Sequence, residues 1–466
     1  MPEAAGEQVA VKAGRHREAT LYHALHGDGA GPAGREGLSP EALREAARRR
    51  FQASELPVWR RSGFWSTSLK DLDIDALEVR THAAGGELPE VVRNTLPARA
   101  VAGRIVQLDG SVVEVQLDPA LAERGVVLCP LEEMLAAGDE RALAHFSKRL
   151  TYDRNKLEAA NAAFWSGGAY LYVPPGVAVE EPFEIVYAIG SEGVAQYGRT
   201  LIVGDRGSDF RVHEYELSEP FAEGGQALHA GAFELYLHDG ARCRLAQVQD
   251  WGTSAPGQVY DVSTRFVGVG RDAYCHWLPS LLGGHLVRQH LELAVSEPGG
   301  DMAFRGLFFS EGREHLDAFA VDLHETGPSG GDVHWRGAAT GESRTSFEGL
   351  IQIDPGAQQT HTYLQIHTMM LSPRARLDAI PSVLVSADDV SASHGGTVGE
   401  LDEDAIFYMQ TRGLDRAAAV RVLVEGFFEP VLAQLADEPL EELVRGRLAA
   451  KLAAAREDIE AYATSR

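Results

Sequence analysis

The chain has 466 residues, of which 44% are hydrophobic, and its 68 acidic and 43 basic side chains give a net charge of −25. This length exceeds what one ordinary core holds, so two or three units or one long repetitive unit are expected. The negative charge disfavours nucleic acid and anionic membranes as partners. The three cysteines, Cys129, Cys243 and Cys275, are scattered and odd in number, which indicates reduced thiols and a cytoplasmic location.

The N-terminal end carries charges without a continuous apolar segment, so no secretory signal is expected. Nor does any window approach about 18 uninterrupted apolar residues, the length that spans a membrane. Residues 1–38 mix alanine, glycine and charge and predict a flexible arm. Ser39 and Pro40 form an N-cap and N1 pair that opens a helix running to Phe51. Residues 63–75 alternate irregularly and predict an ordered turn, and the whole of 39–166 is interpreted as a helical and mixed region.

From Gly167 to Val390 the sequence is dominated by β-branched and aromatic runs separated by turn clusters. Most of the clusters recur at intervals of roughly 30 residues, which indicates a solenoid or an array. A large sandwich is the alternative for so many short strands. The solenoid is favoured because helical patterns occur only at the two ends, like caps. We therefore expect a mainly β core over residues 167–393 and a C-terminal helical region over 394–466.

The C-terminal region contains three predicted helices with aspartate N-caps, at Asp402, Asp415 and Asp437. Gly413 is expected at the C′ position that ends the first of them. An apolar stripe that includes Leu423 and Phe427 follows. Such a stripe is either intramolecular core or, at a chain end, a docking surface.

Two apparent enzyme motifs are interpreted as turns. Gly268-x-Gly270-x-x-Ala273 imitates a dinucleotide fingerprint, but no helix pattern follows it. Residues 327–331 spell G-x-S-x-G, but the sequence continues as a strand, so Ser329 is not expected to be a nucleophile. The sequence also contains no G-x-x-x-x-G-K-[ST] motif, so any nucleotide energy is expected from a partner.

Histidines are abundant in the predicted core, where twelve of the 17 lie between His213 and His394. Several alternate with apolar residues, as in His361, His367 and the pair His285 and His290, as expected for the polar face of a strand. A permanent iron–sulfur cluster needs about four thiolates, and a structural zinc site needs a characteristic Cys/His spacing, and neither pattern is present. No stably bound metal or cofactor is therefore expected.

His394 stands out because it lies between Ser393 and the pair Gly395-Gly396. We expect it in a glycine-flanked loop between a strand over 383–390 and the helix that begins near Asp402. Glycines there would let another backbone or an ion approach the imidazole. In the structural alternative, His394 only holds this corner by bonding to a backbone carbonyl.

The segment around His394 also carries a family pattern. It combines a strand ending in A-D-D-V, the string S-H-G-G-T-x-G, an acid-rich helix with F-Y, and R-G, which here are Ala387–Val390, Ser393–Gly399, Phe407-Tyr408 and Arg412-Gly413. Phe347-x-Gly349-Leu350-Ile351 and Trp65-x-Thr67-x-Leu69 add to it. This combination resembles the SufB/SufD family of iron–sulfur assembly scaffolds, and more closely its SufD branch, from about residue 40 to about residue 435.

The resemblance implies a right-handed parallel β-helix between helical ends. It also implies a subunit that is not an enzyme by itself and that forms a complex with a SufB-like scaffold and a SufC-like ATPase. The residues implied in ATPase docking are Phe407, Tyr408, Arg412, Gly413, Leu423 and Phe427. His394 is implied as a ligand of transient iron or a nascent cluster at the interface with the SufB-like subunit, and a homodimer is expected as an alternative assembly of the isolated chain.

This chain departs from the family pattern at three positions. SufB-like chains carry a cysteine where this chain has Ile366 and a glutamate where it has Gly395, and some SufD-like chains carry a cysteine where it has Ala392. His394 is therefore expected to be one donor of a shared site whose thiolate and carboxylate come from a partner. The alternatives left open are a β-helical carbohydrate-active or metal-dependent enzyme and a purely structural partner.

Overall fold

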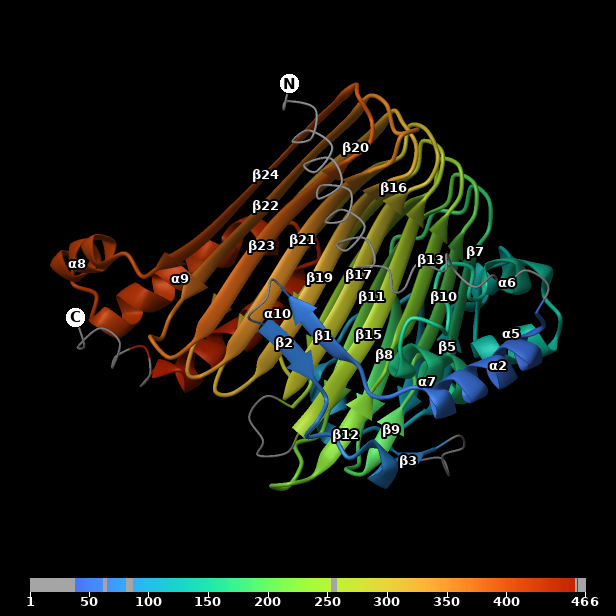
Figure 1. The fold of residues 1–466 in the computed structure, drawn as a ribbon, viewed down its shortest axis with the longest axis horizontal. Helices are drawn as coiled ribbons and strands as arrows, with labels where there is room; N and C mark the ends of the chain where they lie inside the picture. The colour runs from blue at the N-terminus through green and yellow to red at the C-terminus, as the bar shows by residue number, and fades with distance from the viewer. Residues whose placement is uncertain (1–37, 62–64, 81–86, 253–257, 457–458, 460–466) are drawn as a thin grey trace, which may run out of the picture.

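This computed structural model describes residues 38–61, 65–80, 87–252, 258–456 and 459. Two long β-sheets lie face to face through most of the molecule, with helices at the N-terminal and C-terminal ends (Figure 1). The first residues of the predicted arm, 1–37, lie outside the described residues. No described helix is long and apolar enough to cross a membrane.

The N-terminal region alternates short helices and strands. Its elements are α2 (Pro40–Ala53), β1 (Val58–Arg61), β2 (Trp65–Ser68), η1 (Ile74–Ala76), β3 (Glu78–Val79), α3 (Glu90–Thr95), β4 (Gly103–Leu108), β5 (Ser111–Leu117), α4 (Pro119–Glu123), β6 (Val127–Cys129), α5 (Leu131–Ala136), α6 (Glu140–His145) and α7 (Lys156–Phe164).

The β core alternates between the two sheets. One sheet has the order β23-β21-β19-β17-β15-β13-β10-β7-β6 with β12, β9 and β3 at its side, and the other has the order β24-β22-β20-β18-β16-β14-β11-β8-β4-β5. Successive turns of the chain therefore place one strand in each sheet. From β7 to β24 the core strands pair in parallel, for example through His315 with Arg344 and Arg344 with Arg376. The predicted parallel β-solenoid is confirmed, and the sandwich alternative is wrong.

The strands of the core have these bounds: β7 (Ala169–Val173), β8 (Phe183–Ile189), β9 (Val194–Gln196), β10 (Arg199–Gly204), β11 (Asp209–Ser218), β12 (Gln226–His229), β13 (Ala232–Leu237), β14 (Arg242–Asp250), β15 (Gln258–Val269), β16 (Tyr274–Leu281), β17 (Leu286–Val295), β18 (Asp301–Ser310), β19 (His315–His324), β20 (Ser329–Ala339), β21 (Arg344–Ile353), β22 (Thr360–Met370), β23 (Arg376–Val385) and β24 (Val390–Glu400).

The space between the sheets is filled by inward side chains from every turn. Trp335 lies 4.5 Å from Phe347 between ring centroids, and the side chain of Trp335 occupies the position that a Cβ on Gly306 would need. Gly306 thus makes room for an indole on the neighbouring strand, because a Cβ there would stand 2.3 Å from the ring. A glycine opposite a large ring on the adjacent strand lets the interior pack closely at this position.

A polar layer interrupts this interior. Arg265 on β15 contacts the carboxylates of Glu214 and Glu216 on β11 of the opposite sheet, and all three side chains are buried. Burial raises the pKa of Glu214 to about 7, whereas Arg265 and His229 lower the pKa of Glu216 despite its burial. The polar layer joins the two sheets through these ion pairs. Removal of one partner would leave the other charged groups buried without compensation.

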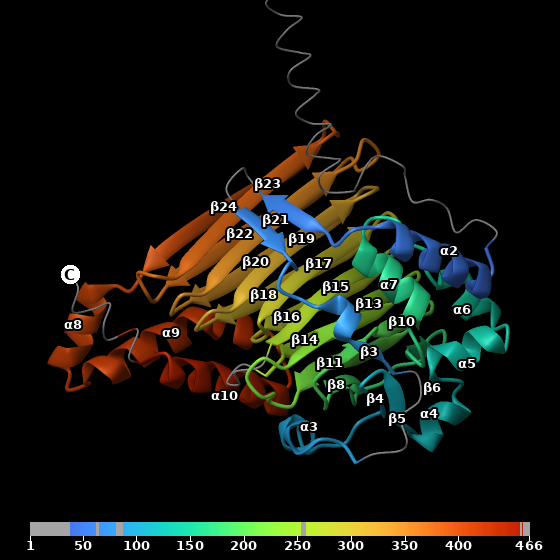
Figure 2. The same ribbon diagram turned by 60° about the horizontal axis from the view of Figure 1, so that its bottom comes forward.

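Helices cover the outer faces of both sheets (Figure 2). N-terminal helices such as α2 and α7 pack on the 12-stranded sheet through an apolar cluster that includes Leu43 and Leu157. On the 10-stranded sheet, α9 (Arg416–Leu432) and α10 (Glu438–Ala454) pack through a cluster that includes Phe428 and Leu448. The helices bury the carboxyl halves of the strands beneath them, for example Tyr215 on β11.

The predicted helix boundaries are confirmed by their caps. Ser39 accepts a hydrogen bond from the Ala42 amide at 3.2 Å, and the aspartate before each C-terminal helix accepts one from the amide three residues on. Gly413 has φ +96°, the left-handed conformation that ends α8 (Glu403–Thr411).

Two local predictions are wrong. Residues 65–68, expected in a turn, form β2, which pairs with β1 and places the buried Thr67 hydroxyl 3.0 Å from His315 Nε2. The segment after Val385 is not one strand followed by a loop, because β23 ends there and β24 then runs from Val390 to Glu400. The expected boundary at residue 394 therefore falls within a strand.

Candidate partner interface and ligand site

The C-terminal end of the solenoid is open. β23 is the last strand of one sheet and β24 the last strand of the other, and each pairs with a single core neighbour, β21 and β22 respectively (Figure 2). An edge strand presents a row of backbone donors and acceptors that a further strand can pair with. Within the described residues, both sheets therefore end on the same side of the molecule with an unpaired edge.

Apolar side chains that would be core in any earlier turn are exposed at this end. Val383 and Val385 on β23 pair in register with Ile351 and Ile353, both fully buried, so they project to the inward side of the sheet. Yet Val383 is 38% exposed and Val385 is 42% exposed. Val398 on β24 is 47% exposed. This end has the composition of an interior without the next turn to cover it.

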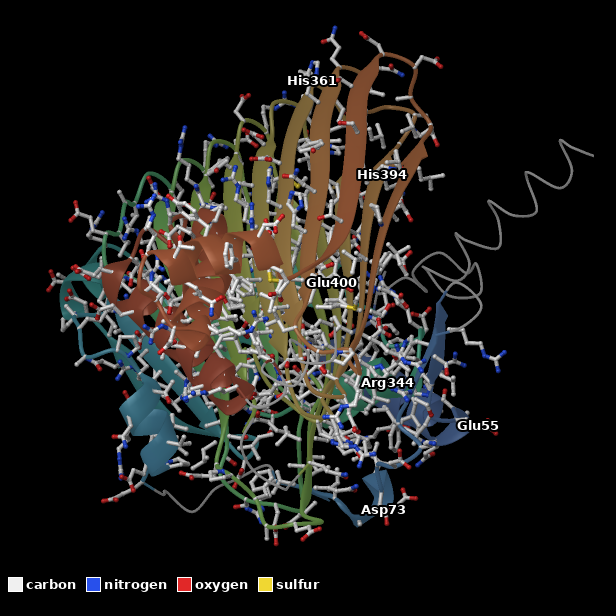
Figure 3. All side chains as sticks on the ribbon, turned by 90° about the vertical axis from the view of Figure 1, so that its left-hand side faces the viewer. Glu55, Asp73, Arg344, His361, His394 and Glu400 are labelled. Atoms are coloured by element: carbon white, nitrogen blue, oxygen red, sulfur yellow. The ribbon has the colours of Figure 1, made fainter. Side chains whose placement is uncertain are left out.

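His394 lies on the inward side of β24. Its register partner on β22 is Leu364, which belongs to the interior cluster, and side chains of directly paired residues project to the same face. His394 itself is exposed, and Figure 3 shows it on the outermost strand of the sheet. It forms no hydrogen bond or ion pair with the residues that the structure describes. The structural alternative, a corner histidine bonded to a backbone carbonyl, gains no support.

The two glycines after His394 differ in their surroundings. A Cβ on Gly396 would stand 3.2 Å from Cγ of Pro381 on β23, so Gly396 permits the two last strands to approach each other. A Cβ on Gly395 would meet only the Tyr363 hydroxyl, at 3.9 Å, an ordinary contact. Gly395 lies on the outward side of β24, opposite to His394, so the open space beside it does not adjoin the imidazole.

Donor atoms other than the His394 imidazole are scarce at this site. Its inward neighbours are Ala392 and Gly396 on its own strand and Leu364 and Ile366 on β22. Ile366, where a SufB-like chain would carry cysteine, is fully buried in the interior cluster. Among the described residues no group of three or more His, Cys, Asp or Glu side chains converges on a metal-sized site. At this end of the solenoid, the described residues therefore supply a single ligand for an ion, the His394 imidazole.

The cysteines lie elsewhere. Cys243 on β14 and Cys275 on β16 are register partners in the buried interior, and burial raises the pKa of both thiols well above the ordinary value. Burial and the nearby carboxylates of Glu133 and Asp139 raise the pKa of Cys129 to about 11. All three therefore stay protonated near neutral pH, and a thiol must lose its proton to bind a metal.

The helix α8 projects away from the sheets beyond the end of β24 (Figure 1). Its side chains Phe407 and Tyr408 are 67% and 58% exposed, the largest values among the exposed large hydrophobic residues that the structure describes. Arg412 lies over the Tyr408 ring, 5.0 Å from its centroid, and donates a hydrogen bond to the Tyr408 hydroxyl at 3.1 Å. Arg412 and Gly413 thus hold and end a helix that presents two aromatic rings to solvent.

Glu403 joins α8 to the rest of the C-terminal region. Both of its carboxylate oxygens accept hydrogen bonds at 2.7 Å from Arg416, the first residue of α9. Such a paired arrangement fixes the direction of both side chains. The position of the exposed rings is therefore set by a charged link between two helices.

Leu423 and Phe427 are placed differently from Phe407 and Tyr408. Both are half-buried and pack against the apolar cluster between α9, α10 and the 10-stranded sheet. Arg336 on β20 lies 5.1 Å from the Phe427 ring centroid and donates a hydrogen bond to its carbonyl oxygen at 2.8 Å. These two residues hold α9 on the solenoid, and exposed Leu414 and Val422 are the apolar neighbours of α8 that remain accessible.

Neither rejected enzyme motif is followed by a helix, but the prediction that Ser329 is a turn residue is wrong, because β20 begins at this residue. Residues 268–273 join β15 to β16. Ser329 begins β20, where its buried hydroxyl lies 2.8 Å from both His324 Nδ1 and Thr360 Oγ1.

Sequence reasoning missed the exposed valines of the open end. Their alternation in Val383-Leu384-Val385 marks a strand, but the absence of a covering turn is visible only in the structure.

A solenoid of paired parallel sheets, capped by helices and open at one end, defines the class of protein. The model of the family described as SUF system FeS cluster assembly, SufBD core domain, matches residues 187–427. The chain belongs to this SufBD family, and its membership supports a role in iron–sulfur cluster assembly.

Curated relatives agree with this assignment. An iron–sulfur cluster assembly SufBD family protein of Staphylococcus epidermidis is 24% identical over 395 residues, which cover 82% of this chain and 84% of the relative. The iron–sulfur cluster assembly protein SufB of Bacillus subtilis is 24% identical over the same length, with the same coverage. The similarity thus extends well beyond the matched core.

Proposed function

We propose that this chain is a non-catalytic, SufD-type scaffold subunit that acts in the cytoplasm with a SufB-like scaffold and a SufC-like ATPase. The observation that carries the proposal is the open end of the solenoid. There, two free strand edges and three exposed valines, Val383, Val385 and Val398, meet the requirements of a stable protein interface.

The partner at the open end is a SufB-like chain. Addition of its last strands to β23 and β24 would pair the free backbone groups and cover the exposed valines. A homologous solenoid offers two edge strands with matching spacing, so the two interiors would become continuous. In the absence of that partner, the same end can pair with a second copy of this chain, which accounts for the expected homodimer.

His394 supplies one ligand to the iron or nascent cluster that is assembled there. The donor set of this chain is a single exposed imidazole, which fits one position of a shared site and no more. A thiolate and a carboxylate from the SufB-like partner would complete a mixed, open site, from which a cluster can be released. The chain holds no metal or cofactor stably by itself under this proposal.

The ATPase docks on the C-terminal helices. Exposed aromatic rings are enriched at the energetic centres of protein interfaces, and Phe407 and Tyr408 on the projecting α8 have this character. The Glu403–Arg416 link and the packing of α9 on the sheet would carry a displacement of α8 towards the strands near His394.

The proposal is tested by blocking the open end. Val385→Lys with Val398→Lys places two charges on surfaces that become buried in the complex, so the mass of the assembly with a SufB-like chain, measured by light scattering after size-exclusion chromatography, should fall to that of the separate chains. Val115→Lys is the control, because Val115 is 45% exposed on β5 at the opposite edge of the same sheet. An unchanged mass in the double variant, or equal loss in the control, would contradict the proposed interface.

A further inference from the structure

The outer face of the 10-stranded sheet has a basic half. The carboxyl halves of its strands lie under α9 and α10, but the amino halves carry outward polar side chains. Arg211 on β11, Arg244 on β14 and His276 on β16 are consecutive partners in register. Arg242 lies two residues before Arg244 on the same face. We call Arg211, Arg242 and Arg244 the arginine cluster.

The charge of the arginine cluster is only partly compensated by acidic side chains. Arg211 is directly paired with Arg244 across two strands about 4.8 Å apart, a placement that is unfavourable for like charges. The guanidinium groups of the cluster form no hydrogen bond or ion pair with other residues of the described ranges. Asp209 is the register partner of Arg242, and Asp301 lies in the same row on β18, so both offset part of the charge. No acidic residue stands between Arg211 and Arg244. In a chain of net charge −25, this is a local reversal of sign.

Unsatisfied polar atoms lie at the floor of this face. His276 is 8% exposed, and its Nε2 atom is buried without a hydrogen-bond partner. Burial, with Arg305 and Arg244 nearby, lowers the pKa of His276 to about 4, so the ring is neutral at physiological pH. Arg305 on β18 contacts Asp332, but its buried Nε atom also has no partner. Buried polar atoms of this kind normally have a partner, so the two atoms mark a polar region beneath the exposed guanidinium groups.

The dimensions of the face favour a peptide over a small ion. From β11 to β18 and on to β20 the face crosses five neighbouring strands, or about 20 Å. An extended chain covers about 3.3 Å per residue, so about six residues would span it. Carboxylates pair well with the planar guanidinium group. The overall charge of the chain repels the long polyanion of a nucleic acid, whereas a short acidic segment meets only the local positive field.

We propose that the arginine cluster, with His276 and Arg305 beneath it, binds an acidic segment of a partner protein. The bound segment would lie across the amino halves of the strands, with its Asp and Glu carboxylates on the guanidinium groups. This surface is distinct from the open end and from α8, so its occupation does not depend on either proposed interface.

The test uses the full chain and a fluorescein-labelled peptide of about eight residues that alternates Asp and Glu, measured by fluorescence anisotropy. We expect saturable binding at low salt that weakens as ionic strength rises, because screening acts strongly on exposed charges. Arg211→Gln with Arg244→Gln should weaken binding roughly tenfold or more. Arg344→Gln with Arg376→Gln is the matched control, because these exposed arginines are also register partners but lie on the opposite sheet (Figure 3).

Several results would overturn the proposal. The proposal is wrong if the peptide shows no saturable binding or if the control variant weakens binding equally. It is also wrong if inorganic phosphate displaces the peptide at a lower concentration than unlabelled peptide does, or if a single-stranded oligonucleotide binds more tightly. Self-association of the wild type that is lost in Arg211→Gln with Arg244→Gln would assign the face to a second copy instead. Thermal unfolding of both variants at the wild-type temperature would show that the loss of binding is not a loss of folding.

Discussion

At the scale of single residues, a buried ion pair attaches the last C-terminal helix to the solenoid. Lys451 on α10 is almost fully buried, and its ammonium group donates hydrogen bonds to Glu311 at 2.9 Å and to Glu314 at 3.2 Å. These two glutamates lie in the turn between β18 and β19. The pairing joins the last helix to the solenoid through charges that are shielded from water.

Burial raises the pKa of Glu314 to about 7 from 4.5, and the attraction of Lys451 only partly opposes this effect. The folded chain therefore holds the Glu314 proton more tightly than the unfolded chain between these two pH values. Because the folded state binds more protons in that window, the contribution of Glu314 to stability falls as pH rises from about 4.5 to about 7 and stays constant above it.

We predict that Glu314→Gln removes this pH dependence. The difference in free energy of unfolding between wild type and variant should change by up to about 3 kcal/mol across the window, at about 1.4 kcal/mol per pKa unit. Urea denaturation at a series of pH values measures it. Glu342→Gln, in the turn between β20 and β21, is the control, because Glu342 is half-exposed beside Arg374. A difference that stays constant with pH would show that Glu314 titrates normally.

Residues in local motifs could be identified from the sequence, whereas long-range side-chain pairs could not. His394 could be singled out because the surrounding motif is local and contiguous. The pairing of Lys451 with Glu314 could not, since it joins segments far apart in the chain and the sequence assigns no partner to a charge. The same holds for Arg265 and the carboxylates of β11, which meet only because the solenoid brings opposite sheets together.

At the scale of elements, β24 shows why a strand can be mistaken for a loop. Gly395, Gly396 and Gly399 lower its intrinsic strand propensity, and its sequence therefore predicts a loop. Pairing along its whole length with β22 outweighs that propensity. The helices, by contrast, could be predicted to within a few residues, because aspartate caps and Gly413 act through local hydrogen bonds.

The element most exposed to a partner is α8. We predict that Phe407→Ala with Tyr408→Ala weakens binding of a SufC-like ATPase at least tenfold, or about 1.4 kcal/mol, because large exposed rings dominate interface energies. The thermal unfolding temperature should not change, since both side chains are largely exposed. Isothermal titration calorimetry measures the affinity, with Val115→Ala on β5 as the control. Wild-type affinity in the double variant would remove α8 from the docking surface.

At the scale of the whole molecule, the recurrence of turns at roughly 30 residues predicted the solenoid, because each turn adds one strand to each sheet. The same recurrence does not reveal where the solenoid stops or which end stays open. That depends on which strands lack a neighbour, a property of the assembled fold. The composition gives the net charge of −25, but it does not reveal the basic face. That face forms because alternating arginines on neighbouring strands project to the same side of the sheet.

We propose that the open end of the solenoid forms a shared site to which His394 contributes a ligand. The measurement is the iron and acid-labile sulfide content of the complex reconstituted with SufB-like and SufC-like partners, for wild type, His394→Ala and His367→Ala. His367 lies on β22, where its Nδ1 is 2.8 Å from the Thr397 hydroxyl, and serves as the control histidine. We predict an intact complex in all three, with a loss of cluster of roughly tenfold in His394→Ala only. Wild-type cluster content in His394→Ala would contradict the account.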